Sequence, residues 1–160
     1  VGTHVSLLLP HGEGQENENN PRPRTEREAE PSTARGRTVL VVDDEPGVRK
    51  LAVRWLRQQG YHVLEAKSGD DALERIEELD GAIDVMFSDI VMPGILDGYT
   101  LAREVARRYP NIGIQLATGY DQERRLQAGS KEQMKFPVLL KPYDLNDLAA
   151  CIQAQVRERP

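Results

Sequence analysis

Cysteine is almost absent from this chain: Cys151 is the only one among 160 residues, so no intrachain disulfide can form. No apolar run approaches the roughly 20 residues that a membrane-spanning helix needs, and the start of the chain lacks the flanks of a signal peptide. The three histidines, His4, His11 and His62, are scattered without the spacing of zinc ligands. These absences exclude a disulfide-stapled domain and a transmembrane span, and they disfavour a zinc site.

Positive charge is also scarce. The chain has 21 Lys and Arg against 26 Asp and Glu, which gives a formal net charge of -5 at pH 7. Because basic side chains that neutralise phosphates supply most non-specific affinity for nucleic acids, an acidic chain without a basic stripe is a poor candidate for binding DNA or RNA. We therefore expect a cytoplasmic segment that contacts neither nucleic acid nor membrane.

The composition changes sharply near Thr38. Residues 11–37 are mainly Gly, Glu, Asn, Pro, Arg, Ser and Thr, which cannot bury enough apolar surface to offset the entropy lost on ordering. From Thr38 onward, short apolar runs alternate with helical patterns, as is typical of βαβ units around a parallel sheet. We predict a flexible linker over residues 11–37 and one folded domain over residues 38–158.

Five strands and about five helices are predicted in this domain. The strands are expected at residues 38–42, 62–65, 83–88, 111–117 and 137–140. Pro46 suits the first turn of the first helix, and Ser68 and Asp144 can cap the second and the last. Residues 122–135 carry few large apolar side chains, so a short or irregular helix is expected there. Right-handed crossovers then favour an α/β fold with a doubly wound, five-stranded parallel sheet.

The helical spacing of apolar residues predicts which helix faces are buried. The stripe of the first helix consists of Val48, Leu51, Ala52, Trp55 and Leu56, and that of the second of Ala72, Leu73, Ile76 and Leu79. We expect both stripes to pack against the sheet.

Polar side chains follow four of the predicted strands. Asp43 and Asp44 follow the first, Asp89 the third, Thr118 the fourth and Lys141 the fifth. In an open α/β sheet, ligands bind beyond the carboxyl ends of the strands, so these side chains are expected to converge. Each has a local explanation as a cap, turn or loop residue, but three carboxylates brought together are costly unless a cation compensates them.

This set of groups suits phosphoryl transfer. Hard carboxylate oxygens are good ligands for Mg²⁺, and a carboxylate can also act as a nucleophile that forms an aspartyl-phosphate. A metal ion and a lysine neutralise charge on the transferred group, and a hydroxyl donor can hold a further oxygen. The residues therefore predict a Mg²⁺-dependent phosphoacceptor.

Four short motifs, in this order and spacing, are highly specific. They are VLVVDDEP at residues 39–46, SDIVMPG at residues 88–94, the Thr118-Gly119 step, and LLKPY at residues 139–143. From about residue 38 to residue 156, the chain resembles the receiver domain of response regulators, of the chemotaxis-regulator type. The resemblance implies a flavodoxin-like fold with strand order 2-1-3-4-5. It also implies a two-component phosphorelay function, in which the domain takes a phosphoryl group from a phosphohistidine and changes conformation to signal.

The resemblance implies Mg²⁺ as the cofactor. Its protein ligands would be the carboxylates of Asp43, Asp44 and Asp89 and the backbone carbonyl of Val91. The implied partners are a histidine kinase, either the chain's own kinase core or a cognate one, and a histidine phosphotransfer protein.

Three residues are implied to handle the phosphoryl group itself. Asp89 would be the phosphoacceptor, Thr118 the switch hydroxyl that contacts the phosphoryl group, and Lys141 the cation that pairs with a phosphoryl oxygen. The bond from Lys141 to Pro142 would be cis. Val138 stands where the family often has a switch aromatic, so we expect the conformational change to use residues 119–135 instead.

Two further features resemble parts of histidine kinases. The loop at residues 92–98 is one residue longer than the commonest receiver version, a form familiar in receivers fused to, or working with, such kinases. In residues 1–10, a Gly-Thr step precedes an alternating apolar run that ends in Pro10, as in the last strand of a histidine-kinase ATP-binding domain. We expect the C-terminal receiver of a hybrid sensor histidine kinase, whose parent could be membrane-anchored. An unrelated leader peptide is the alternative.

An enzyme and a flavin carrier are the competing classes. Haloacid-dehalogenase phosphatases also use an aspartyl nucleophile on an α/β sheet, but in a D-x-D pattern after the first strand, whereas Asp43 and Asp44 are adjacent. A flavin-binding carrier would need a phosphate-cradling loop at that place, and Asp43, Asp44 and Glu45 would repel the flavin phosphate. We therefore expect a signalling phosphoacceptor and not an enzyme.

Overall fold

The computed structural model describes residues 34–119 and 135–157. The strands in these ranges are β1 (Thr38–Val42), β2 (His62–Ala66), β3 (Val85–Asp89), β4 (Gly113–Gly119) and β5 (Val138–Lys141). The helices in the same ranges are α1 (Pro46–Gln58), α2 (Gly69–Glu78), α3 (Gly98–Arg108) and α5 (Leu145–Arg157). All strand pairs are parallel, in the order β2-β1-β3-β4-β5, which confirms the doubly wound, flavodoxin-like sheet.

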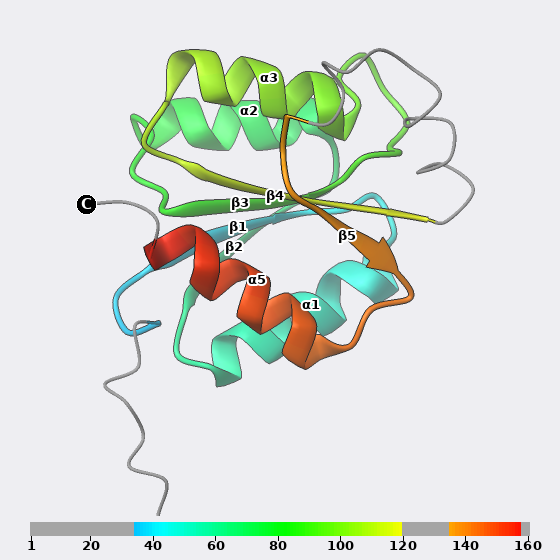
Figure 1. Cartoon of the computed structure of the whole chain (residues 1–160). Helices are drawn as coiled ribbons and strands as arrows, with labels where there is room; N and C mark the ends of the chain where they lie inside the picture. The colour runs from blue at the N-terminus through cyan, green and yellow to red at the C-terminus, as the bar shows by residue number, and fades with distance from the viewer. Residues whose placement is uncertain (1–33, 120–134, 158–160) are drawn as a thin grey trace, which may run out of the picture. The chain divides into compact units, whose positions relative to one another are not determined.

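Helices cover both faces of the sheet (Figure 1). α2 and α3 pack on one face, and α1 and α5 pack on the other. The residues of β1 alternate between the two resulting cores. Leu40 and Val42 belong to the core beneath α2 and α3, whereas Val39 and Val41 belong to the core beneath α1 and α5. Burial on both faces explains why the strand reads as a continuous apolar run.

Local chemistry starts the helices where the sequence predicts. Pro46 lies in the first turn of α1. The Ser68 side chain accepts a hydrogen bond from the Asp71 N–H at 3.2 Å, and Asp144 Oδ1 accepts one from the Asn146 N–H at 2.6 Å. Each carboxylate or hydroxyl oxygen thus satisfies a backbone donor that the first helical turn leaves without a partner.

Strands β3 and β4 begin later than predicted, at Val85 instead of residue 83 and at Gly113 instead of residue 111. The reason is Asp84, whose carboxylate and carbonyl accept hydrogen bonds from backbone N–H groups of other segments, so that the regular strand begins only after it. The Thr38 N–H donates to the Asp84 carboxylate at 2.7 Å, and the Gly113 N–H donates to the Asp84 carbonyl at 2.8 Å. Asp84 therefore joins the beginnings of β1 and β4 to the chain that enters β3.

Two leucines in the predicted helix stripes are exposed, which corrects the sequence analysis. Leu51 on α1 is 55% exposed, and Leu79, just after α2, is 40% exposed. Val53 is buried in α1 instead, together with Ala52 and Leu56. The buried side of α1 is therefore rotated toward Val53, and Leu51 is left on its flank.

The expected linker and N-terminal strand, and the irregular helix expected at residues 122–135, lie almost wholly outside the described residues. Within residues 34–119 and 135–157, no helix combines the length and the apolar character that crossing a bilayer requires.

Candidate functional site

The parallel register brings the ends of the strands together at one edge of the sheet. Asp89, the last residue of β3, is in register with Ala117 on β4. Lys141, the last residue of β5, is in register with Gly119, which is the last residue of β4. Asp43 follows directly after β1, the neighbour of β3. Residues nearly 100 positions apart in the chain therefore meet at the predicted edge.

Three carboxylates gather there. Asp43, Asp44 and Asp89 each offer an oxygen, and these oxygens all lie within 4.8 Å of one another. Asp43 is buried, Asp89 is partly buried and Asp44 is exposed. The set fits Mg²⁺, which takes a few carboxylates and keeps open positions for water and phosphate oxygens. The exposed side of the cluster leaves room for those ligands.

Lys141 compensates the charge of two of these carboxylates. Its Nζ lies 2.8 Å from Oδ2 of Asp89 and 3.1 Å from Oδ2 of Asp43. Burial raises the pKa of the Asp89 carboxyl, and the hydrogen bond from Lys141 opposes that rise. Burial alone lowers the pKa of Lys141, but the bonds to Asp89 and Asp43 outweigh burial and raise the pKa overall. A protonated lysine therefore stands beside the candidate acceptor.

The chain after β3 folds tightly around Asp89. The Val91 N–H lies 3.4 Å from Asp89 Oδ1, and the Gly98 N–H donates to the Ile90 carbonyl at 2.9 Å. A Cβ added at Gly98 would lie 1.8 Å from the carbonyl oxygen of Asp89. Gly98 is thus needed for the close approach of α3 to the acceptor. The sequence does not by itself predict this role, although a glycine directly after Asp97, the N-cap of α3, is a usable signal.

The structure locates Thr118 on its strand and confirms one backbone feature that the resemblance implies, the cis bond before Pro142. Thr118 lies on β4, is fully buried and is in register with Leu140 on β5. The peptide bond between Lys141 and Pro142 is cis. The contact of the Thr118 hydroxyl with a phosphoryl group stays a prediction, as does the metal-ligand role of the Val91 carbonyl.

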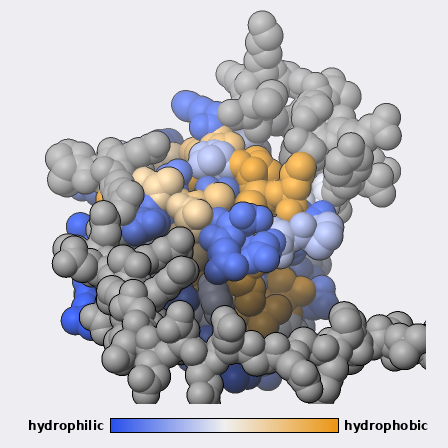
Figure 2. Space-filling model, turned by 60° about the horizontal axis from the view of Figure 1, so that its bottom comes forward, coloured by the Kyte–Doolittle hydropathy of each residue, from blue (hydrophilic) through white to orange (hydrophobic). Residues whose placement is uncertain are grey.

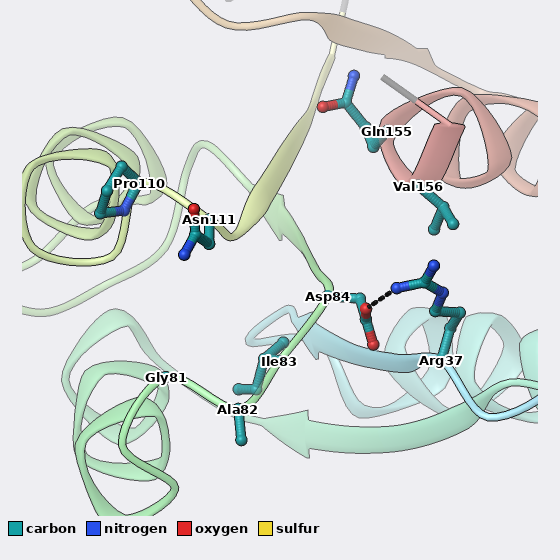
Figure 3. A pocket seen from close by; sticks show the side chains of 9 residues that line it. All are labelled: Arg37, Gly81, Ala82, Ile83, Asp84, Pro110, Asn111, Gln155 and Val156. Carbon is teal, nitrogen blue, oxygen red and sulfur yellow. Dashed lines mark hydrogen bonds and ion pairs between the residues drawn. The ribbon is translucent and has the colours of Figure 1, made fainter. Parts of the chain in front are cut away.

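A large pocket lies at the opposite edge of the sheet and carries no comparable chemistry. It holds about 700 Å³ and lies between the starts of the strands and the end of α5 (Figure 3). Its cation, Arg37, is paired with Asp84 at 2.7 Å. An already neutralised guanidinium is a poor anion site, so the carboxylate edge remains the candidate functional site.

Known proteins of similar sequence include kinases and small regulators. The chain is 42% identical over 125 residues to the sensor kinase CckA of Brucella abortus, a match that covers 76% of this chain and 13% of that protein. It is 33% identical over 112 residues to the response regulator receiver protein CpdR of the same organism, covering 70% of this chain and 90% of that protein. The chain thus spans about an eighth of the kinase and nearly all of the regulator.

Solved structures agree with these relatives. The receiver domain from the hybrid histidine kinase CckA has a TM-score of 0.61 and 34% identity, covering 74% of this chain and 98% of that chain. The response regulator TrrA from Thermotoga maritima, solved with Mg²⁺ and BeF, has a TM-score of 0.63 and 28% identity, with the same coverages of 74% and 98%.

The response regulator receiver domain profile matches residues 39–153, and the chain belongs to that family. Asp43, Asp44 and Asp89 form the acidic pocket in which receiver domains accept phosphoryl groups in two-component signalling.

Proposed function

We propose that Asp89 takes the phosphoryl group from a phosphohistidine, with Mg²⁺ held by Asp43, Asp44, Asp89 and the Val91 carbonyl. The observation that carries this proposal is the convergence of three carboxylates and Lys141 at one sheet edge. The Mg²⁺-bound structure of TrrA supports the choice of metal.

Each residue has a defined task in this transfer. An oxygen of Asp89 forms a bond to phosphorus while the bond from phosphorus to the donor imidazole nitrogen breaks, and the released imidazole takes a proton from solvent. Mg²⁺, when bound, neutralises charge on the phosphoryl oxygens. Lys141 Nζ, already 2.8 Å from Asp89, pairs with one phosphoryl oxygen, and the Thr118 hydroxyl donates to another.

The first prediction tests this chemistry directly. Acetyl phosphate with Mg²⁺ should add one acid-stable, base-labile phosphoryl group to the chain, measured by intact mass. EDTA should abolish the incorporation, because the uncompensated carboxylates then repel the anionic donor. Incorporation that is unaffected by EDTA would show that the acidic cluster does not act through a metal ion.

A protein donor needs a surface to dock on, and α1 offers one beside the acceptor. A groove of about 460 Å³ runs between α1 and the chain after β5. Its apolar lining includes Val48, Leu51, Pro142, Tyr143 and Leu145, and Lys141 also lines it. Figure 2 turns the side of the molecule that carries α1 and α5 toward the viewer and shows hydrophobic surface beside strongly hydrophilic surface there. Burial raises the pKa of Tyr143 to about 12, so this apolar lining stays uncharged.

We therefore expect Leu51→Asp to slow phosphoryl transfer from a phosphohistidine protein, because a charge would be buried at the docking surface. Transfer from acetyl phosphate, which needs no docking, should be unchanged. Leu79→Asp is the matched control, since Leu79 is also an exposed leucine but does not line this groove. Radiolabel transfer from a phosphorylated kinase core measures both rates. Equal slowing by the two variants would argue against the groove.

We also propose which protein carries the phosphohistidine that donates to this receiver. The match to a small part of a sensor kinase, and the kinase-like pattern of residues 1–10, support the C-terminal receiver of a hybrid histidine kinase, joined by a linker over residues 11–37. The match to nearly all of CpdR supports the alternative, a separate regulator. The coding sequence upstream of Val1 separates the two, because only the hybrid kinase has a kinase core there.

A further inference from the structure

Arg49 connects three segments of the chain next to the acidic cluster. It lies in the first turn of α1, and its Nη1 donates to the backbone carbonyl of Asp43 at 2.6 Å. Its Nε lies 3.5 Å from Oε2 of Glu65 on β2. The Arg49 side chain is 14% exposed, against 42% for Glu65. A nearly buried guanidinium therefore ties the residue that follows β1 to α1 and β2.

The position of Asp44 depends on the backbone carbonyl that Arg49 binds. This carbonyl belongs to the peptide group that joins Asp43 to Asp44, so its direction sets the direction of the Asp44 Cα atom. The other groups of Asp43 are also held: Oδ1 accepts from the Glu45 N–H at 2.9 Å, and Oδ2 accepts from Lys141 at 3.1 Å. The carbonyl contact adds a restraint from α1 on the direction in which the chain leaves Asp43.

We propose that Arg49 is a positioning residue for the acidic pair: its guanidinium fixes the Asp43–Asp44 peptide so that the Asp44 carboxylate meets the metal together with Asp43 and Asp89. This inference rests on the proposed Mg²⁺ site. Arginine suits the task because its planar fork can bind two acceptors at once, whereas a lysine ammonium is a compact point charge. Partners outside the ligand shell commonly control how well the ligands are oriented.

A positioning role and a purely electrostatic role of Arg49 predict opposite changes in Mg²⁺ affinity when the guanidinium is removed. Substituting Arg49 therefore separates the two. A cation near a metal site repels the metal, so removing its charge should tighten Mg²⁺ binding. Removing an anchor should weaken Mg²⁺ binding. We expect Arg49→Gln to raise the Kd for Mg²⁺ about tenfold, as losses of outer-shell partners do. Arg49→Lys should also weaken binding, because the charge remains but the fork is lost.

The experiment is a titration of the whole chain with Mg²⁺ alone, followed by amide NMR shifts. Arg54→Gln is the matched control, because Arg54 is an exposed arginine of the same helix and should leave the Kd unchanged. Tighter or unchanged binding in Arg49→Gln, or full affinity in Arg49→Lys, would overturn the inference. Should Arg49→Gln fail to fold, Arg49→Lys decides by itself.

A second readout separates positioning from general damage. At saturating Mg²⁺, the rate of phosphoryl incorporation from acetyl phosphate into Arg49→Lys should return to the wild-type value, because Asp89 and Lys141 are untouched. A rate that stays low at saturation in a folded variant argues against positioning of the metal ligands. If the wild type itself binds no Mg²⁺, the proposed function fails. If the wild type binds and the variants bind equally well, only the Arg49 inference fails.

Discussion

Replacing Asp89 with asparagine is expected to abolish phosphoryl incorporation. The carboxamide has nearly the shape of the carboxylate but is neither anionic nor nucleophilic, so no acyl-phosphate bond can form. The fold should survive, because Lys141 keeps its contact with Asp43 at 3.1 Å when the Asp89 contact is weakened. Intact mass after incubation with acetyl phosphate and Mg²⁺ measures the loss, and we expect no phosphorylated species above background.

Asp97→Asn provides the matched control for this substitution. Asp97 caps α3, where its Oδ1 accepts from the Thr100 N–H at 2.7 Å, and asparagine caps helices about as well as aspartate. This variant should therefore incorporate phosphoryl groups like the wild type. Full labelling of Asp89→Asn would place the acceptor on another residue and refute the assignment.

Substituting alanine for Gly98 is expected to cause the largest loss of stability among conservative changes near the site. The new Cβ would lie 1.8 Å from the Asp89 carbonyl oxygen and 2.7 Å from its carbonyl carbon. The clashing atoms belong to the backbone, which cannot change rotamer as a side chain can. Either α3 or the end of β3 must therefore move. We expect a loss of about 3 kcal/mol in the free energy of unfolding, the upper part of the range for overpacking, together with slower phosphoryl incorporation.

Urea unfolding of Gly98→Ala beside Gly47→Ala measures this effect. Gly47 lies in α1, and apart from its chain neighbours and the backbone of its own helix no atom lies within 4 Å of the position its Cβ would take. Alanine there should be neutral or stabilising by up to about 1 kcal/mol, because alanine favours helix more than glycine does. An unfolding midpoint of Gly98→Ala equal to that of the wild type would show that the contact with Asp89 relaxes at little cost.

The strand bounds and helix starts that the sequence predicts correctly depend on residues that lie close together along the chain. The bounds of β1, Thr38–Val42, were predicted correctly because a strand buried on both faces leaves a continuous apolar run. The starts of α1 and α2 were predicted correctly because Pro46 and Ser68 act within a few residues along the chain. The starts of β3 and β4 were missed because Asp84 binds backbone groups more than 25 residues away.

The sequence by itself determined which chemical groups gather at one edge of the sheet. Asp43, Asp89 and Lys141 follow recognisable strands, and the ends of parallel strands must share an edge. Only the tertiary structure decided how those groups are held. Three features depend on how each helix is rotated and placed against the sheet. They are the exposure of Leu51, the hydrogen bond from Arg49 to the Asp43 carbonyl, and the close approach of Gly98 to Asp89. Helical spacing defines only an approximate apolar side, and packing between distant segments selects the final angle and the contacts.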